Sequence, residues 1–156
     1  MRISDILDES VVRVNLKGKT KDEIINQMIA IVTSSKKITD IEKVREAIFE
    51  REKIMSTGVG NGFAIPHGKT DAVVDIVAAF AITEGPIDYD SLDEQPVRLI
   101  FLLVGKDSMV GPHIKLLSRI SRLMNKEEFR TKLLSASSEK EVIDIFKTEE
   151  ATYFES

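Results

Sequence analysis

The chain has 156 residues, no cysteine and a formal net charge of -4, with 42% hydrophobic and 31% charged residues. This length suits one globular domain with a hydrophobic core, and the missing cysteines exclude disulfides, cysteine-ligated metal centres and thiol nucleophiles. The negative charge argues against nucleic acid as the main ligand, because binding to a phosphate backbone requires a dense cationic surface.

The N-terminal segment, residues 1–9, is acidic and contains no long apolar run. It is therefore unlike a signal peptide, and nowhere does the chain reach the roughly 18 apolar residues of a membrane helix. We expect a soluble, cytoplasmic protein. The β-branched residues 11–14 then predict the first strand.

Three S/T-x-x-E capping boxes predict the starts of helices. They are formed by Thr20 with Glu23, Thr39 with Glu42, and Ser138 with Glu141. The first helix is expected over residues 20–33, and the second is expected to reach Arg51.

Two nearly continuous apolar runs, residues 75–82 and 97–104, have the length of strands and indicate a sheet that is covered by helices on both faces. An amphipathic helix is expected to begin at Pro112–His113, with its apolar side formed by Ile114, Leu117, Ile120 and Met124. Residues 126–134 predict a further short helix. The fold class is thus α/β, a single domain with a mixed β-sheet flanked by helices on both faces.

The segment 58–69, GVGNGFAIPHGK, contains four of the eight glycines and one of the two histidines. A dinucleotide-binding loop needs a preceding strand and a third glycine, whereas here the preceding segment is helical and Phe63 occupies that position. A P-loop needs a closing Gly-Lys-Ser/Thr, which is absent. The segment is better interpreted as a mount for the imidazole of His67.

Pro66 makes Ile65 extended and fixes the direction in which His67 projects. Gly68 is expected to leave the space beside the imidazole open to a large partner or an anion.

Both histidines follow a proline, and His113 is expected at a helix N-terminus, where free N–H groups attract a phosphoryl group. The guanidinium of Arg51 suits the same anion, although a cation at a helix C-terminus is an equally ordinary role for it. Ser56 is expected to be a turn residue, and Thr57 either a turn residue or a donor to the anion. Two histidines alone are too few for a metal site, and no H-E-x-x-H spacing is present.

Residues 51–53 and 56–69 resemble the active-site signature of the enzyme IIA domains of the bacterial phosphoenolpyruvate-dependent sugar phosphotransferase system, in the fructose/mannitol/nitrogen-regulatory class. The resemblance continues through residues 87–104 and 112–120. It implies an EIIA type-2 domain over residues 1–150, followed by a C-terminal tail, 151–156.

The resemblance also implies roles for three of the candidate residues. His67 accepts the phosphoryl group, with the Nε2 (tele) nitrogen expected, while His113 and Arg51 support it. From its place beside these residues, and not from the resemblance, we also expect Thr57 to bind the phosphoryl group. Met109 and Val110, in the loop before His113, are either docking residues, which we favour, or residues that only pack the loop. No metal and no cofactor is expected.

Two functions follow from the resemblance. In the first, the protein accepts the phosphoryl group from a phosphorylated HPr-type carrier and passes it to a IIB component for uptake of a fructose-like sugar. In the second, a nitrogen-type IIA protein controls regulatory target proteins through its phosphorylation state. Contact with a membrane is expected only indirectly, through a permease, and nucleic acid is not expected as a partner.

Overall fold

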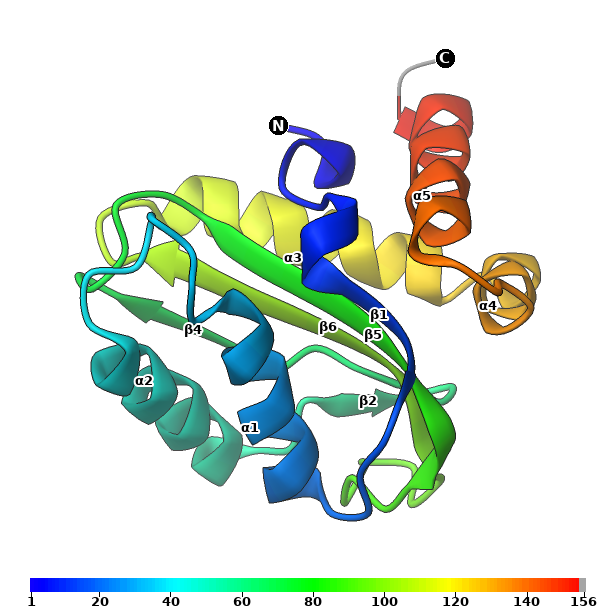
Figure 1. Ribbon diagram of the computed structural model, residues 1–156, viewed down its shortest axis with the longest axis horizontal. Helices are drawn as coiled ribbons and strands as arrows, with labels where there is room; N and C mark the ends of the chain where they lie inside the picture. The colour runs from blue at the N-terminus through cyan, green and yellow to red at the C-terminus, as the bar shows by residue number, and fades with distance from the viewer. Residues whose placement is uncertain (155–156) are drawn as a thin grey trace.

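The computed structural model describes residues 1–154 and shows one sheet between two layers of helices (Figure 1). Two short 3-10 turns, η1 and η2, precede the first strand. The elements in chain order are η1 Ile3–Asp5, η2 Glu9–Val11, β1 Val12–Leu16, α1 Lys21–Val32, α2 Ile41–Ile54, β2 Gly58–Gly60, β3 Phe63–Ala64, β4 His67–Thr70, β5 Val77–Ile87, β6 Val97–Lys106, α3 Val110–Met124, α4 Glu127–Leu134 and α5 Glu139–Phe154.

The sheet is mixed, as predicted. Its strand order is β1-β5-β6-β3-β2, and β4 also pairs with β6. β5 is antiparallel to β6, whereas β3 and β4 both run parallel to β6 and follow one another along the same edge of it. Ile65 and Pro66 separate them, because proline has no N–H to donate to the ladder. The carbonyl of Pro66 still accepts a hydrogen bond from the N–H of Leu103 at 3.1 Å.

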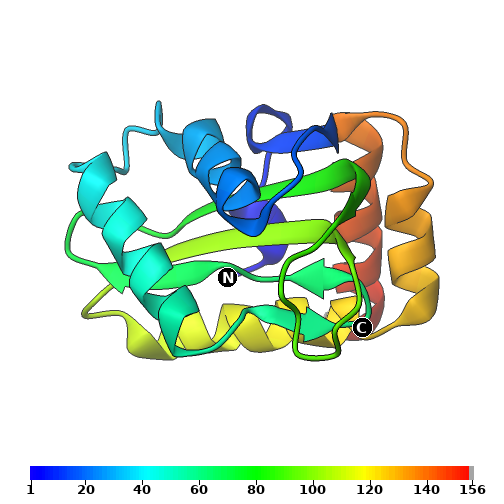
Figure 2. The ribbon, with the colours of Figure 1, turned by 90° about the horizontal axis from the view of Figure 1, so that it is seen from below.

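Helices cover both faces of the sheet (Figures 1 and 2), and each face has its own hydrophobic core. Alternate residues of β5 and β6 point to opposite faces. Phe80 and Phe101 belong to the core beneath α3, α4 and α5, whereas Ala79 and Leu102 belong to the core beneath α1 and α2. The prediction that helices cover both faces is therefore confirmed.

The helix starts that the first and third boxes predict are confirmed, since Thr20 and Ser138 accept from the N–H groups of Glu23 and Glu141, both at 3.2 Å. The reciprocal bonds differ from a capping box, because the two glutamate carboxylates accept from the N–H groups of Lys19 and Ser137, one residue before each cap. The second box is wrong. Asp40 caps α2 by accepting from the N–H groups of Glu42 and Lys43, at 3.1 and 3.4 Å, while the hydroxyl of Thr39 donates to the carbonyl of Ala72. A carboxylate beside the helix start displaced the hydroxyl that the pattern favoured.

Helix α3 begins at Val110, earlier than predicted, and Pro112 lies in its first turn, where the missing N–H is tolerated. Its apolar side also differs from the prediction: Ile120 and Met124 are buried, but Ile114 is 59% exposed. Helix α5 continues to Phe154, into the predicted C-terminal tail, whereas residues 155–156 lie outside the described part. Over residues 1–154, no helix is sufficiently long and apolar to cross a membrane.

Candidate active site

The sequence-predicted histidines meet in a cavity of about 500 Å³ at strand β4, between helices α2 and α3. β4 pairs only with β6, so its other side is open to residues from both helices (Figure 2). The lining comprises Ala47, Glu50, Arg51 and Ile54 of α2, His67, Gly68 and Lys69 of β4, Asp107, and His113, Ile114 and Leu117 of α3.

His67 is the first residue of β4 and is half-buried. Its Nδ1 lies 2.7 Å from the carbonyl oxygen of Ile65. Because a carbonyl can only accept, Nδ1 carries the proton and donates it, which leaves the lone pair on Nε2. In this tautomer, Nε2 is the ring nitrogen that can act as a nucleophile.

Burial is the main cause that lowers the pKa of His67, and the positive charges of Arg51 and Lys69 act in the same direction. The hydrogen bond to Ile65 and the charge of Glu52 raise this pKa, but by less. His67 is therefore neutral near pH 7, which is the form in which an imidazole can act as a nucleophile.

His113 is only 2% exposed, and its ring centroid lies 5.8 Å from that of His67. Burial lowers the pKa of His113 to about 4, with smaller contributions from the charges of His67 and Lys69. Neither ring nitrogen has a hydrogen-bond partner within the described structure. Because buried polar atoms are nearly always paired, this imidazole is poised to donate to a group that enters the cavity.

The backbone of His113 does not serve as the anion site that the sequence suggested. Its N–H is bonded to the carbonyl of Met109 at 3.2 Å, because α3 starts before it. In a helix that begins at Val110, the N–H groups without an intrahelical acceptor come earlier in the chain. The side chain of His113, and not its N–H, faces the site.

Gly105 of β6 makes room for His113, which sequence reasoning missed. A Cβ at this position would lie 2.4 Å from Nδ1 of His113, far inside contact distance. The available signal was a glycine inside an apolar strand, which often marks the close approach of another group.

Arg51 and Lys69 supply the positive charge of the cavity. Arg51 lies in the last turn of α2, which continues to Ile54, and it donates to the carbonyl of Met55 at 2.9 Å. Arg51 therefore caps the helix and also lines the cavity. Its two expected roles, a cation at the helix C-terminus and a ligand for an anion, are compatible. Lys69, which sequence reasoning missed, lies two residues after His67 and thus on the same side of β4.

Gly68 has a different role from the predicted one. It is buried, and a Cβ there would lie 3.0 Å from the backbone carbon of Ala47. The missing side chain lets α2 lie close to β4 and so brings Arg51 toward His67. It does not open a path for a partner.

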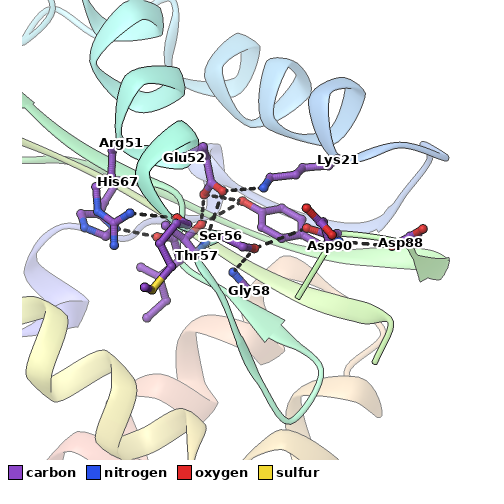
Figure 3. Close-up of polar contacts among 12 residues, drawn as sticks. Lys21, Arg51, Glu52, Ser56, Thr57, Gly58, His67, Asp88 and Asp90 are labelled. Atoms are coloured by element: carbon purple, nitrogen blue, oxygen red, sulfur yellow. Dashed lines mark hydrogen bonds and ion pairs between the residues drawn. The ribbon is translucent and has the colours of Figure 1, made fainter. Parts of the chain in front are cut away.

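The prediction that Thr57 binds the phosphoryl group is corrected. Thr57 is 2% exposed, and its hydroxyl is bonded to the carboxylate of Glu52 and lies 3.1 Å from the hydroxyl of Tyr89 (Figure 3). Its hydrogen-bonding capacity is thus used inside the protein. Ser56 is a turn residue, as predicted, since its hydroxyl accepts from the N–H of Gly58 at 3.1 Å.

Met109 and Val110, the predicted docking residues, lie at the start of α3 and are 38% and 42% exposed. Within residues 1–154, no group of three or more histidine, aspartate or glutamate side chains is arranged to hold a metal ion.

Comparisons with known proteins agree on one family. Residues 5–149 match the family described as "Phosphoenolpyruvate-dependent sugar phosphotransferase system, EIIA 2". The chain is 38% identical over 145 residues to the fructose-specific EIIABC component of Bacillus subtilis, a match that covers 93% of this chain but only 23% of that longer protein.

Solved structures give the same result. The nitrogen regulatory protein IIA-Ntr of Neisseria meningitidis superimposes with a TM-score of 0.87 at 31% identity, over 92% of this chain and 98% of that one. The complex of IIA mannitol with phosphorylated IIB mannitol from Escherichia coli matches with a TM-score of 0.78 at 20% identity, over 91% of this chain and 97% of that one, which shows the shared fold.

Proposed function

Since the chain belongs to the EIIA 2 family of the phosphoenolpyruvate-dependent sugar phosphotransferase system, a family of phosphoryl-transfer components, we propose that His67 is its phosphoryl acceptor. The donor is a phosphorylated HPr-type carrier, and the acceptor is a IIB component. The observation that carries the assignment is the bond from Nδ1 of His67 to the carbonyl of Ile65, which leaves Nε2 free in a cavity lined by cations.

The reaction is an exchange between two imidazoles. Nε2 of His67 attacks the phosphorus of the donor's phosphohistidine; a new N–P bond forms, and the donor's N–P bond breaks with its electron pair returning to the donor nitrogen. The ring of His67 then carries both the phosphoryl group on Nε2 and the proton on Nδ1. The carbonyl of Ile65, which already accepts that proton's hydrogen bond, stabilises the positive charge of the ring.

Phosphoryl transfer requires mainly positioning and charge stabilisation. Arg51 and Lys69 offset the charge of the phosphoryl oxygens. His113, neutral near pH 7, donates its single N–H to one of them. It supports the group without carrying it, because at 2% exposure a partner's phosphohistidine cannot reach its ring.

Fructose-type transport is the role that we favour. The similarity to the fructose-specific component of Bacillus subtilis is the observation behind it, and the mannitol complex of Escherichia coli motivates a IIB component as the partner. The nitrogen-regulatory alternative rests on the similarity to the IIA-Ntr protein of Neisseria meningitidis. In either role the protein acts in the cytoplasm and meets a membrane only through a permease.

The acceptor residue is tested by incubating the protein with labelled phosphoenolpyruvate, enzyme I and HPr. We expect acid-labile, alkali-stable label on the wild-type protein and none on His67→Ala. Label that persists in His67→Ala would overturn the assignment. Transfer of the label to a fructose-type IIB component, as opposed to its loss by hydrolysis, would favour transport over regulation.

A further inference from the structure

A buried polar network lies behind His67, outside the cavity itself (Figure 3). At its centre is Glu52 of α2, only 7% exposed. Its carboxylate forms an ion pair with Lys21 of α1 at 2.8 Å and accepts from the hydroxyl of Tyr89 at 3.1 Å. It also accepts from the N–H of Thr57 at 3.2 Å and from the hydroxyl of the same residue.

This network holds its members in one arrangement. A buried carboxylate is costly unless its lone pairs are occupied, and here two hydroxyls, one N–H and one ammonium occupy them. Burial and the charge of Glu52 raise the pKa of Tyr89, so its hydroxyl stays protonated and donates. Lys21 also lies 5.1 Å from the centre of the Tyr89 ring. Glu52 thus connects α1, α2 and two loops at one point.

A short path of hydrogen bonds leads from Glu52 to the reacting imidazole. Glu52 fixes Thr57 through two bonds, and the carbonyl of Thr57 accepts from the N–H of Ile65 at 3.0 Å. The carbonyl of Ile65, in turn, accepts from Nδ1 of His67 at 2.7 Å. Each step sets the position of the next residue, and the last one sets the tautomer of His67.

We propose that Glu52 is a positioning residue for His67: by fixing Thr57 and through it Ile65, it holds the Nδ1–H tautomer and directs phosphorylation to Nε2. The part that concerns phosphorylation rests on the proposed function, whereas the part that concerns the tautomer does not. Glu52 touches no reacting atom.

Glu52→Gln tests the proposal with little change of shape. The neutral amide retains one acceptor oxygen and adds two donors, so it cannot satisfy all four groups that surround the carboxylate. We expect nitrogen NMR of His67 to show one dominant Nδ1–H tautomer in the wild-type protein and a mixture in the variant. Phosphorylation should give the Nε2 isomer alone in the wild-type protein and both isomers in the variant. In the variant, kcat for accepting the phosphoryl group should fall at least tenfold, while KM for phosphorylated HPr should not change.

Glu149→Gln is the matched control. Glu149 of α5 is also 7% exposed and is paired with a lysine, Lys132 of α4, at 3.0 Å. It does not line the cavity. Its variant should lose stability without any change in the tautomer of His67 or in the phosphohistidine isomer.

Thr57→Val keeps the test decisive if Glu52→Gln fails to fold. Valine has the shape of threonine without the hydroxyl, so we expect the tautomer mixture again, and we expect Thr57→Ser to restore the single tautomer. A folded Glu52→Gln or Thr57→Val protein with the wild-type tautomer and only the Nε2 isomer would overturn the proposal. A wild-type protein with the expected tautomer that takes no label would instead count against the proposed function.

Discussion

The imidazoles of His67 and His113 lie 5.8 Å apart and are tilted by 47° to each other, although one belongs to an edge strand and the other to a helix that begins more than forty residues later. Gly105 of the neighbouring strand makes this approach possible. Both rings line the same cavity, so in the proposed function His113 can donate to a phosphoryl group on Nε2 of His67. His67 is half-buried and His113 is only 2% exposed, so we propose His67 as the phosphoryl acceptor and His113 as a donor that supports the group.

Removing the His113 side chain should impair onward transfer more than acceptance. As the N–P bond of phosphorylated His67 loosens, the phosphoryl oxygens need a donor, and the imidazole of His113, which lines the same cavity, has no other hydrogen-bond partner in the described structure. We expect His113→Ala to accept label from HPr but to deliver it to IIB about 100-fold more slowly. Single-turnover measurements of each half-reaction check this, and unchanged delivery rates would reject the role.

Gly105→Ala should reproduce the transfer defect of His113→Ala while both histidines are still present. The added methyl group would lie 2.4 Å from Nδ1 of His113, so the ring must move away from β6. We expect a loss of stability of about 1–3 kcal/mol, as for other overpacked sites. Gly85→Ala is the control, because a Cβ there meets nothing within 4 Å. Equal transfer rates in the two glycine variants would contradict the steric role of Gly105.

Much of the fold could be predicted because it depends on local patterns. The alternation of Phe80 with Ala79, and the capping bonds of Thr20 and Ser138, belong to their own segments. His67 could be identified as a site residue for the same reason, since its neighbours Ile65 and Pro66 determine its local surroundings. Even here a local competitor decided one case, where Asp40 replaced Thr39 as a cap.

The parts of the site that sequence reasoning missed depend on contacts between distant segments. Lys69 and Gly105 are register partners across β4 and β6, and no local sequence pattern predicts that pairing. A hydroxyl beside an active-site loop favours Thr57 as a donor to phosphate. In the structure Thr57 donates instead to Glu52, five residues earlier, and both are buried against Tyr89, which comes from a distant segment. The role of Gly68 was likewise decided by the helix packed against it.

Stability should depend on pH through His113. Its pKa is lowered to about 4 in the folded protein, so on unfolding it binds a proton at any pH between about 4 and its ordinary value of 6.5. Titration of His113 therefore leaves the free energy of unfolding unchanged above pH 6.5. As the pH falls from 6.5 toward 4, it lowers the free energy of unfolding by at most about 3 kcal/mol. Urea unfolding at pH 7.5 and pH 5 should show a smaller loss for His113→Gln than for the wild-type protein. Equal losses would show that His113 titrates normally in the fold.

Removing the charge of Lys69 should slow acceptance and shift the titration of both histidines. Lys69 lowers the pKa of His67 and of His113, so both values should rise in Lys69→Gln. We expect a reduction in kcat of about tenfold, because one cation near the phosphoryl oxygens is lost. Lys43→Gln is the control, since Lys43 is an exposed lysine of α2 outside the cavity. NMR titration of the two imidazoles provides the measurement, and unshifted values in Lys69→Gln would contradict the assignment.

The apolar residues around the cavity should govern docking and not chemistry. Ile54 and Ile114, both in its lining, are 79% and 59% exposed, and Val110 at the start of α3 is 42% exposed. Burying one such side chain in a complex contributes about 1.5 kcal/mol or more, which corresponds to at least a tenfold change in affinity.

Ile114→Ser should therefore raise KM for phosphorylated HPr by about tenfold with kcat nearly unchanged. Val74→Ser is matched to it, because Val74 is also 59% exposed but lies outside the cavity. If both serine variants had the wild-type KM, docking would have to use another face of the protein, and the assignment of Val110 and Met109 to docking would fall with it.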